Sequence, residues 1–176
     1  MKLRIPAIAV IGVVLLAVSG SAQTPAAPPP NPLDVVPDKM PFDIPYGAPI
    51  SLAKAKKLIE AVEAETRKRG WAMNVAVVDA GGNLVAFDRM DGAQLASITI
   101  AQHKARVAAR FRRETKVFED AVQKGTIYML TLDDVIASRG GFPLIENGTV
   151  IGAIGCSGGA ASQDAVACAV GAALVK

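Results

Sequence analysis

The glycine-rich end of an apolar run near residue 155 most limits what this chain can fold into. Residues 149–156 are apolar or small, and they lead into the turn Ser157-Gly158-Gly159. Glycine permits such a turn because it lacks a Cβ atom and tolerates positive φ. Residues 162–175 are then mostly Ala, Val and Leu, as in a largely buried helix. The pattern predicts a strand, a tight turn and a helix whose first N–H groups can donate to a ligand oxygen.

Two hairpin signals organise the rest of the chain. One is the turn Gly81-Gly82-Asn83, and the other is Asn147-Gly148, a pair that favours two-residue hairpins. The flanking stretches have the composition of strands. They cover residues 73–79, 84–88, 144–146 and 149–156.

Helical spacing of apolar residues predicts four helices around these hairpins. They cover residues 51–70, about 91–111, about 115–124 and 162–175. Ser51 and Asp91 are the expected N-caps of the first two, and Gly70 ends the first. Residues 128–132 are predicted as a short strand or a turn, and residues 139–143 as a loop. The whole pattern predicts an α+β domain with an antiparallel sheet of about five strands flanked by helices.

The N-terminal residues have the order of a secretory signal peptide. Lys2 and Arg4 precede an apolar stretch at residues 5–18, and small residues before Gln23 suit cleavage. The stretch is too short to span a bilayer, which needs about 20 residues. We therefore expect residues 1–22 to be removed, no stable membrane span after cleavage, and a periplasmic or secreted protein.

Residues 23–49 are rich in proline, which predicts an extended arm. Its later half contains Met40, Phe42, Ile44 and Tyr46, so it is expected to lie against its own domain or a neighbouring subunit. Residues 50–176 form the predicted domain.

Charge and aromatic content argue against a nucleic-acid partner. The net charge is +3, and two of these charges belong to the predicted signal peptide. Aromatic residues make up only 5% of the chain, which leaves few rings to stack on bases.

Cys156 and Cys168 are the only cysteines. An oxidising compartment would permit a bridge between them. Small apolar residues flank both, however, which favours two buried free thiols.

Several of these motifs, taken in order, resemble the GlcG/HbpS-like haem-binding family, whose domain also forms the C-terminal part of PduO-type proteins. The motifs are residues 75–79, Gly81-Gly82, residues 89–93, Lys104-Ala105, Gly140-Gly141, Pro143, residues 152–155 and residues 157–159. The resemblance covers residues 50–176. It implies a profilin-like fold, frequent homo-oligomers, and haem or iron binding in some members.

His103 is the only histidine, and the predicted second helix places it on a stripe with Ile100 and Val107. An imidazole on such a face suits an axial ligand of haem iron. A core or interface histidine bonded to a backbone carbonyl would show the same pattern. Arg106 follows on the helix and suits a haem propionate or an organic carboxylate. Arg110, Arg112 and Arg113 follow Arg106. The alternative for these arginines is a solvated face or salt bridges to nearby acidic residues, namely Glu114, Glu119 and Asp120.

Other candidate ligand-binding residues flank the predicted sheet. Arg89 can pair with an acid or a ligand, and Lys104 is either a pocket cation or a surface charge. The remaining candidates belong to the two Gly-Gly loops, whose amides can bind a carboxylate or simply form tight turns. They are Gly140, Gly141, Phe142, Ser157, Gly158 and Gly159.

Residues 155–159 also match the Gly-x-Ser-x-Gly pattern of hydrolases, but no histidine follows Ser157 in the chain. Serine hydrolysis is therefore not expected.

These observations favour an exported protein that binds haem or a related small ligand, with a role in haem or iron sensing, storage or degradation. Two alternatives stay open. One is a small enzyme acting on a carboxylate or a tetrapyrrole, and the other is an accessory subunit of a larger complex.

Overall fold

The computed structural model describes residue 31 and residues 34–176. The chain divides into two units, Met1–Asp38 and Lys39–Lys176, and the fold described here is that of the second. The predicted signal peptide and the first part of the arm lie outside the described residues. None of the helices in the described part of the chain is long and apolar enough to cross a membrane.

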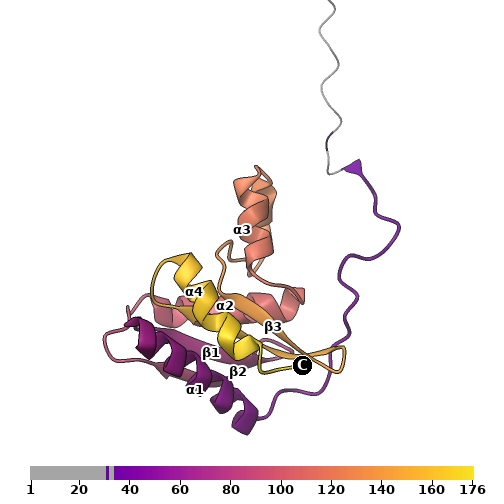
Figure 1. Cartoon of the computed structure of the whole chain (residues 1–176). Helices are drawn as coiled ribbons and strands as arrows, with labels where there is room; N and C mark the ends of the chain where they lie inside the picture. Colours follow the sequence, from indigo (N-terminus) through magenta and orange to yellow (C-terminus); the bar gives the residue numbers. More distant parts are fainter. Residues whose placement is uncertain (1–30, 32–33) are drawn as a thin grey trace, which may run out of the picture. The chain divides into compact units, whose positions relative to one another are not determined.

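The second unit contains four strands and four α-helices around one antiparallel sheet (Figure 1). In chain order they are α1 (Leu52–Arg69), β1 (Asn74–Asp79), β2 (Leu84–Arg89), α2 (Ser97–Phe111), α3 (Lys116–Gln123), the 3₁₀ helix η2 (Ile127–Thr131), β3 (Gly141–Glu146), β4 (Thr149–Ser157) and α4 (Ala161–Ala172). This confirms the predicted α+β class.

The strand order in the sheet is β2-β1-β4-β3, with every neighbour antiparallel. Both predicted hairpins are confirmed, and Asn147 and Gly148 have the positive φ values, 50° and 74°, that this turn requires. The named strands number four rather than about five. A single bridge joins Tyr46 of the arm to Val150, beyond the last pairing of β1 with β4. The arm therefore borders β4 where β1 has ended.

The first helix agrees with the prediction. The Ser51 hydroxyl accepts a hydrogen bond from the Lys54 backbone N–H at 3.2 Å, and Gly70 ends the helix with φ of 68°. The Ser51 hydroxyl thus accepts from a backbone N–H that has no acceptor within the helix. At the other end, only glycine adopts the left-handed cap without cost.

Other boundaries differ from the predictions. Asp91 is not an N-cap, because Gly92 has φ of 77° and the chain makes further turns before α2 begins at Ser97. The last helix ends at Ala172. Residues 127–131 form a 3₁₀ helix, where a short strand or a turn was predicted over residues 128–132. Gly141 begins β3, although residues 139–143 were predicted as a loop. Pro143 is tolerated there because β3 is an edge strand.

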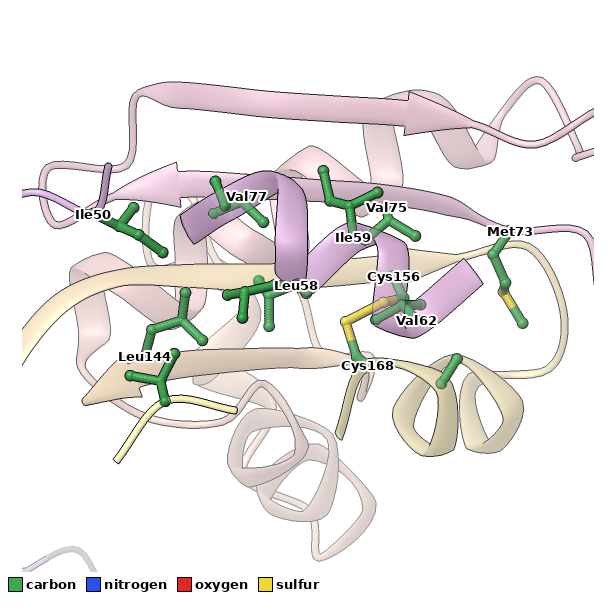
Figure 2. Close-up of a cluster of buried hydrophobic side chains, with 14 of the residues drawn as sticks. Ile50, Leu58, Ile59, Val62, Met73, Val75, Val77, Leu144, Cys156 and Cys168 are labelled. Atoms are coloured by element: carbon green, nitrogen blue, oxygen red, sulfur yellow. A yellow bond between two sulfur atoms is a disulfide. The ribbon is translucent and has the colours of Figure 1, made fainter. Parts of the chain in front are cut away.

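Alternating residues of the central strands face two different cores. Val75 and Val77 of β1 pack toward α1 and α4, in a cluster that also contains Leu58, Ile59 and Val62 (Figure 2). Ala76 and Val78 face the opposite way, toward the alanines of α2. The sheet is therefore covered on both faces, with α2 alone on one of them.

The α2 face is packed backbone against backbone. A Cβ atom on Gly155 would lie 2.2 Å from the Ala101 carbonyl oxygen, and one on Gly141 would lie 2.3 Å from the Lys104 carbonyl oxygen. Real Cβ atoms do not approach so closely. These two glycines of β4 and β3 are required because α2 lies directly on the strands.

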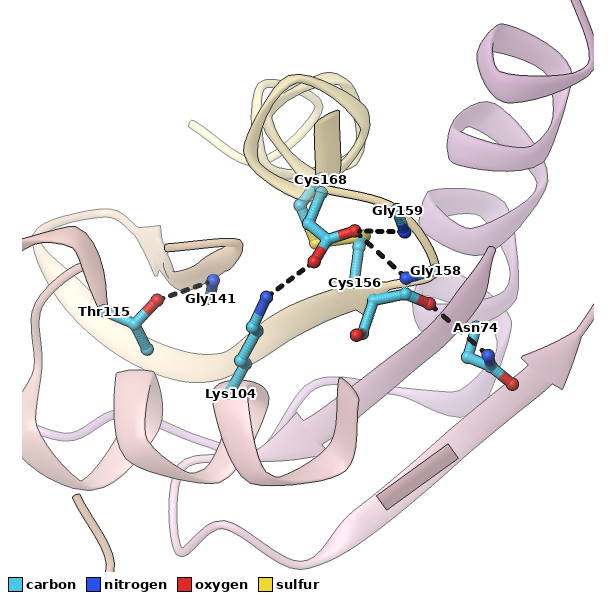
Figure 3. Close-up of a disulfide and its surroundings, with 10 residues drawn as sticks. Asn74, Lys104, Thr115, Gly141, Cys156, Gly158, Gly159 and Cys168 are labelled. Atoms are coloured by element: carbon cyan, nitrogen blue, oxygen red, sulfur yellow. Dashed lines mark hydrogen bonds and ion pairs between the residues drawn. A yellow bond between two sulfur atoms is a disulfide. The ribbon is translucent and has the colours of Figure 1, made fainter. Parts of the chain in front are cut away.

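Cys156 of β4 and Cys168 of α4 form a disulfide, so the prediction of two free thiols was wrong (Figure 3). The apolar neighbours of each cysteine favoured free thiols over the bridge that an oxidising compartment would permit. The sheet and α4 bring the two Cα atoms to 5.5 Å, a normal separation for a bridge.

A buried ion pair joins α2 to α4 beside the disulfide. Lys104 Nζ donates to Asp164 Oδ2 at 2.8 Å, and the two side chains are 1% and 3% exposed. Asp164 Oδ1 accepts from the backbone N–H groups of Gly158 and Gly159, at 3.0 and 3.1 Å (Figure 3). The carboxylate thus has partners on both oxygens, which a buried charge needs.

We predict that Lys104→Met destabilises the protein by about 3–5 kcal/mol, because it leaves a buried carboxylate without its countercharge. Denaturant unfolding followed by circular dichroism measures this. Lys116→Met is the matched control, since it makes the same change at a part-exposed lysine of α3 that pairs with Asp120 and should have little effect. Equal stability of the two variants would contradict the prediction.

Candidate functional site

His103 lies on the side of α2 that faces the segment between η2 and β3. Its side chain is 35% exposed, and its Nε2 atom is 3.0 Å from the backbone carbonyl oxygen of Asp134. A carbonyl oxygen only accepts hydrogen bonds, so Nε2 must carry the hydrogen. The sequence had left open a ligand or a carbonyl-bonded histidine, and the structure shows the carbonyl bond.

Arg106 and Arg110 share this side of α2 with His103. Arg110 Nη1 donates to the Asp134 carboxylate at 2.9 Å, and Arg106 Nη1 lies 3.5 Å from it. Arg110 also donates through Nε to the Gly81 carbonyl oxygen. Their side chains remain 40% and 50% exposed. His103, Arg106, Arg110 and Asp134 are called the Asp134 cluster below.

The partner of these arginines is not the one considered from the sequence. Glu114, Glu119 and Asp120 follow α2 closely in the chain, but the structure places Asp134 beside Arg106 and Arg110. Asp134 has φ of 66°, a left-handed conformation that aspartate tolerates better than most residues. No periodicity marked this residue, because it lies in an irregular segment.

Arg112 and Arg113 lie at the end of α2 and contact the arm. Arg112 donates to the Ile44 carbonyl oxygen at 2.9 Å, and the Arg113 guanidinium lies 3.2 Å from the centre of the Phe42 ring. Burial lowers the pKa of Arg113 from its usual value. These two arginines hold the later half of the arm on its own domain and take no part in the Asp134 cluster.

The two Gly-Gly sites meet at the same end of the sheet, around Lys104 and Asp164. Gly140 has φ of 113°, and a Cβ atom there would lie 2.9 Å from the Asp164 Cβ atom. The Gly158 and Gly159 amides do bind a carboxylate, but it is that of Asp164. Lys104, predicted as a pocket cation or surface charge, is buried as the partner of the same group.

Gly140, Gly141 and Phe142 also line a cavity of about 360 Å³ that opens between β3 and α4. Its other walls are largely apolar residues of α4, with charged residues at the rim. One of these, Arg139, donates to Glu119 through Nε and Nη2 at 2.6–3.0 Å. These hydrogen bonds lower the pKa of Glu119 and raise that of Arg139. Arg139 is therefore already paired.

Ser157 and Arg89 lie apart from the Asp134 cluster. The Ser157 hydroxyl is buried and donates to the Ser97 hydroxyl at 3.0 Å, with no contact to His103. Arg89 is exposed at the end of the edge strand β2, in a shallow pocket with Glu63 and Arg67. Of the predicted site residues, only His103 and Arg106 belong to the Asp134 cluster.

Comparisons with known proteins agree with the fold. The family model described as "Haem degrading protein HbpS-like" matches residues 50–173. Protein GlcG of Escherichia coli K12 is 41% identical over 108 residues, which is 61% of this chain and 81% of GlcG.

Two solved structures share the fold with this chain. A PduOC:heme complex is 27% identical, with a TM-score of 0.66 over 73% of this chain and 96% of that one. A crystal structure of HbpS is also 27% identical, with a TM-score of 0.66 over 74% of this chain and 92% of its own. Since the family model covers most of the chain and the folds coincide, this protein belongs to the HbpS-like family, as its motifs predicted.

Proposed function

We propose that this protein is an exported haem-binding protein with a role in haem or iron sensing, storage or degradation. The Asp134 cluster is the observation that carries the proposal. It presents the only imidazole of the chain together with two guanidinium groups on one part-exposed side of α2. The family description and the haem complex of a structural neighbour support the same ligand.

The chemistry of the donor set fits haem. His103 is the proposed axial ligand, and Arg106 and Arg110 are the proposed partners of the two propionates. Bound haem would supply an iron centre for redox and ligand exchange. The chain's own residues would bind and orient the group. The guanidinium groups would compensate the negative charges of the propionates, which lose hydration when they bind.

The carboxylate-binding alternative loses part of its support. Part of that support came from the Gly158 and Gly159 amides, and these donate to Asp164 inside the protein. A buried carboxylate with Lys104 as its partner satisfies this site without an external anion. We therefore propose the Asp134 cluster, rather than the Gly-Gly loops, as the binding site.

We predict that the purified protein, without a histidine tag, takes up haemin with a Soret maximum that His103→Ala shifts or abolishes. Alanine has no donor atom for iron, and a part-exposed position tolerates it. Absorbance titration gives the spectrum and the affinity. Tyr128→Phe is the control, because tyrosine also ligates haem iron. Loss of the band in the Tyr128 variant alone, or an unchanged His103 variant, would contradict the assignment.

We predict that protein from its native host begins at Gln23 and lacks free thiols. The order of basic, apolar and small residues at the N-terminus supports export. The Cys156–Cys168 disulfide is typical of an oxidising compartment and supports it independently. Intact mass of the unreduced protein tests both, because cleavage and oxidation change the mass separately. A retained Met1 argues against cleavage, and two free thiols argue against the bridge.

We also predict a homo-oligomer. Apolar side chains on α4 and η2 are exposed in the single chain, including Val166 at 44%, Ile127 at 66% and Leu130 at 54%. Burial of such patches between copies removes apolar surface from water. Light scattering at micromolar concentration measures the molecular mass. A mass equal to that of a single chain would contradict the prediction.

A further inference from the structure

Asp134 is the single polar tether of the segment that covers His103. Within the described residues, every hydrogen bond or ion pair that leaves residues 132–138 for another part of the chain involves Asp134. The other recorded bond of the segment is local, from the Val135 N–H to the Leu132 carbonyl oxygen at 3.4 Å. All the polar bonds that hold the segment to α2 therefore come from Asp134.

The same contact determines which nitrogen of His103 is free. Because Nε2 donates its hydrogen to the Asp134 carbonyl oxygen, the lone pair of the neutral ring lies on Nδ1. Nδ1 is next to the Cβ atom and is the more crowded nitrogen. Nε2, the less crowded nitrogen at the far end of the ring, is the one engaged in the hydrogen bond to Asp134.

We propose that Asp134 is a latch that competes with haem iron for Nε2 of His103, so that the protein takes up haem only after residues 132–138 leave α2. This inference depends on the proposed function. The Asp134 carboxylate also occupies Arg106 and Arg110, the two cations proposed for the propionates. Release of one residue thus frees the imidazole and both guanidinium groups together.

The structure favours a latch that opens. Asp134 keeps a left-handed backbone with φ of 66°, which a non-glycine residue adopts at a cost. Its carboxylate bonds run to part-exposed arginines, and such pairs contribute little to stability. The neighbouring segment is exposed or half-buried from Leu132 to Arg139, so its departure uncovers little core.

Three variants test the latch. Asp134→Asn removes the charge while keeping a residue suited to the left-handed conformation, and it is the principal variant. Asp134→Gly removes the carboxylate but also the backbone cost that favours opening, so its effect should be smaller. Asp133→Asn is the matched control, because it removes one exposed negative charge from the adjacent position. Circular dichroism establishes that each variant is folded, and Asp134→Asn carries the test if Asp134→Gly does not fold.

The first readout needs no haem. His103 is the only histidine, so the untagged protein has one imidazole to observe by nitrogen NMR. We expect wild type and Asp133→Asn to show a ring N–H signal at Nε2 that its hydrogen bond protects from exchange with water. We expect Asp134→Asn to weaken or lose it. An equally protected ring N–H in Asp134→Asn, or none in wild type, overturns the latch.

The second readout is haemin titration of the same proteins. We expect Asp134→Asn to bind haemin roughly two- to tenfold more tightly than wild type and Asp133→Asn, the range that one hydrogen bond supplies. Equal or weaker binding overturns the latch. If no protein takes up haemin, the latch and the haem-binding function both fail. The NMR result then still decides whether Asp134 holds His103.

Discussion

The direct contact between the backbone of α2 and the backbones of β3 and β4 determines most of this structure. It exists because Gly141 and Gly155 lack side chains at the two points where the helix crosses the strands. The alanines of α2 fill most of the remaining space between the helix and the sheet. This packing brings Lys104 to the end of the sheet, where its ammonium group reaches a carboxylate on α4. It also leaves the opposite side of α2, with His103, free of the sheet.

The end of the sheet illustrates how a protein can use an anion-binding geometry for its own structure. The amides after β4 and a nearby cation form a site of the kind that binds ligand carboxylates. Here Asp164 supplies the carboxylate from within α4, and its charge lies at the start of that helix, where the dipole favours an anion. The disulfide holds the same helix to β4. Rigidity at this end contrasts with the Asp134 cluster, which depends on part-exposed contacts.

The sequence predicted local features well and tertiary partners poorly. The α1 caps, both hairpins and the α+β class followed from residue types at short spacing, such as Ser51 and Asn147-Gly148. The start of α2 was wrong because Asp91 resembles an N-cap, while Gly92 turns the chain away from a helix. His103 and Arg106 were candidates from the sequence, but Asp134 and Asp164 were not. Their importance comes from distant elements that the fold brings together, and spacing along the chain carries no signal for that.

Pro143 has a consequence for how copies of this protein can associate. It lies in β3, an outer strand of the sheet, and contributes no N–H group. A second sheet that approached this strand would find a gap in the row of donors it needs to continue the ladder. Growth of one sheet into another along β3 is therefore disfavoured. Copies that meet at this edge must therefore recognise one another through side chains, whereas β2 at the other edge of the sheet carries no proline.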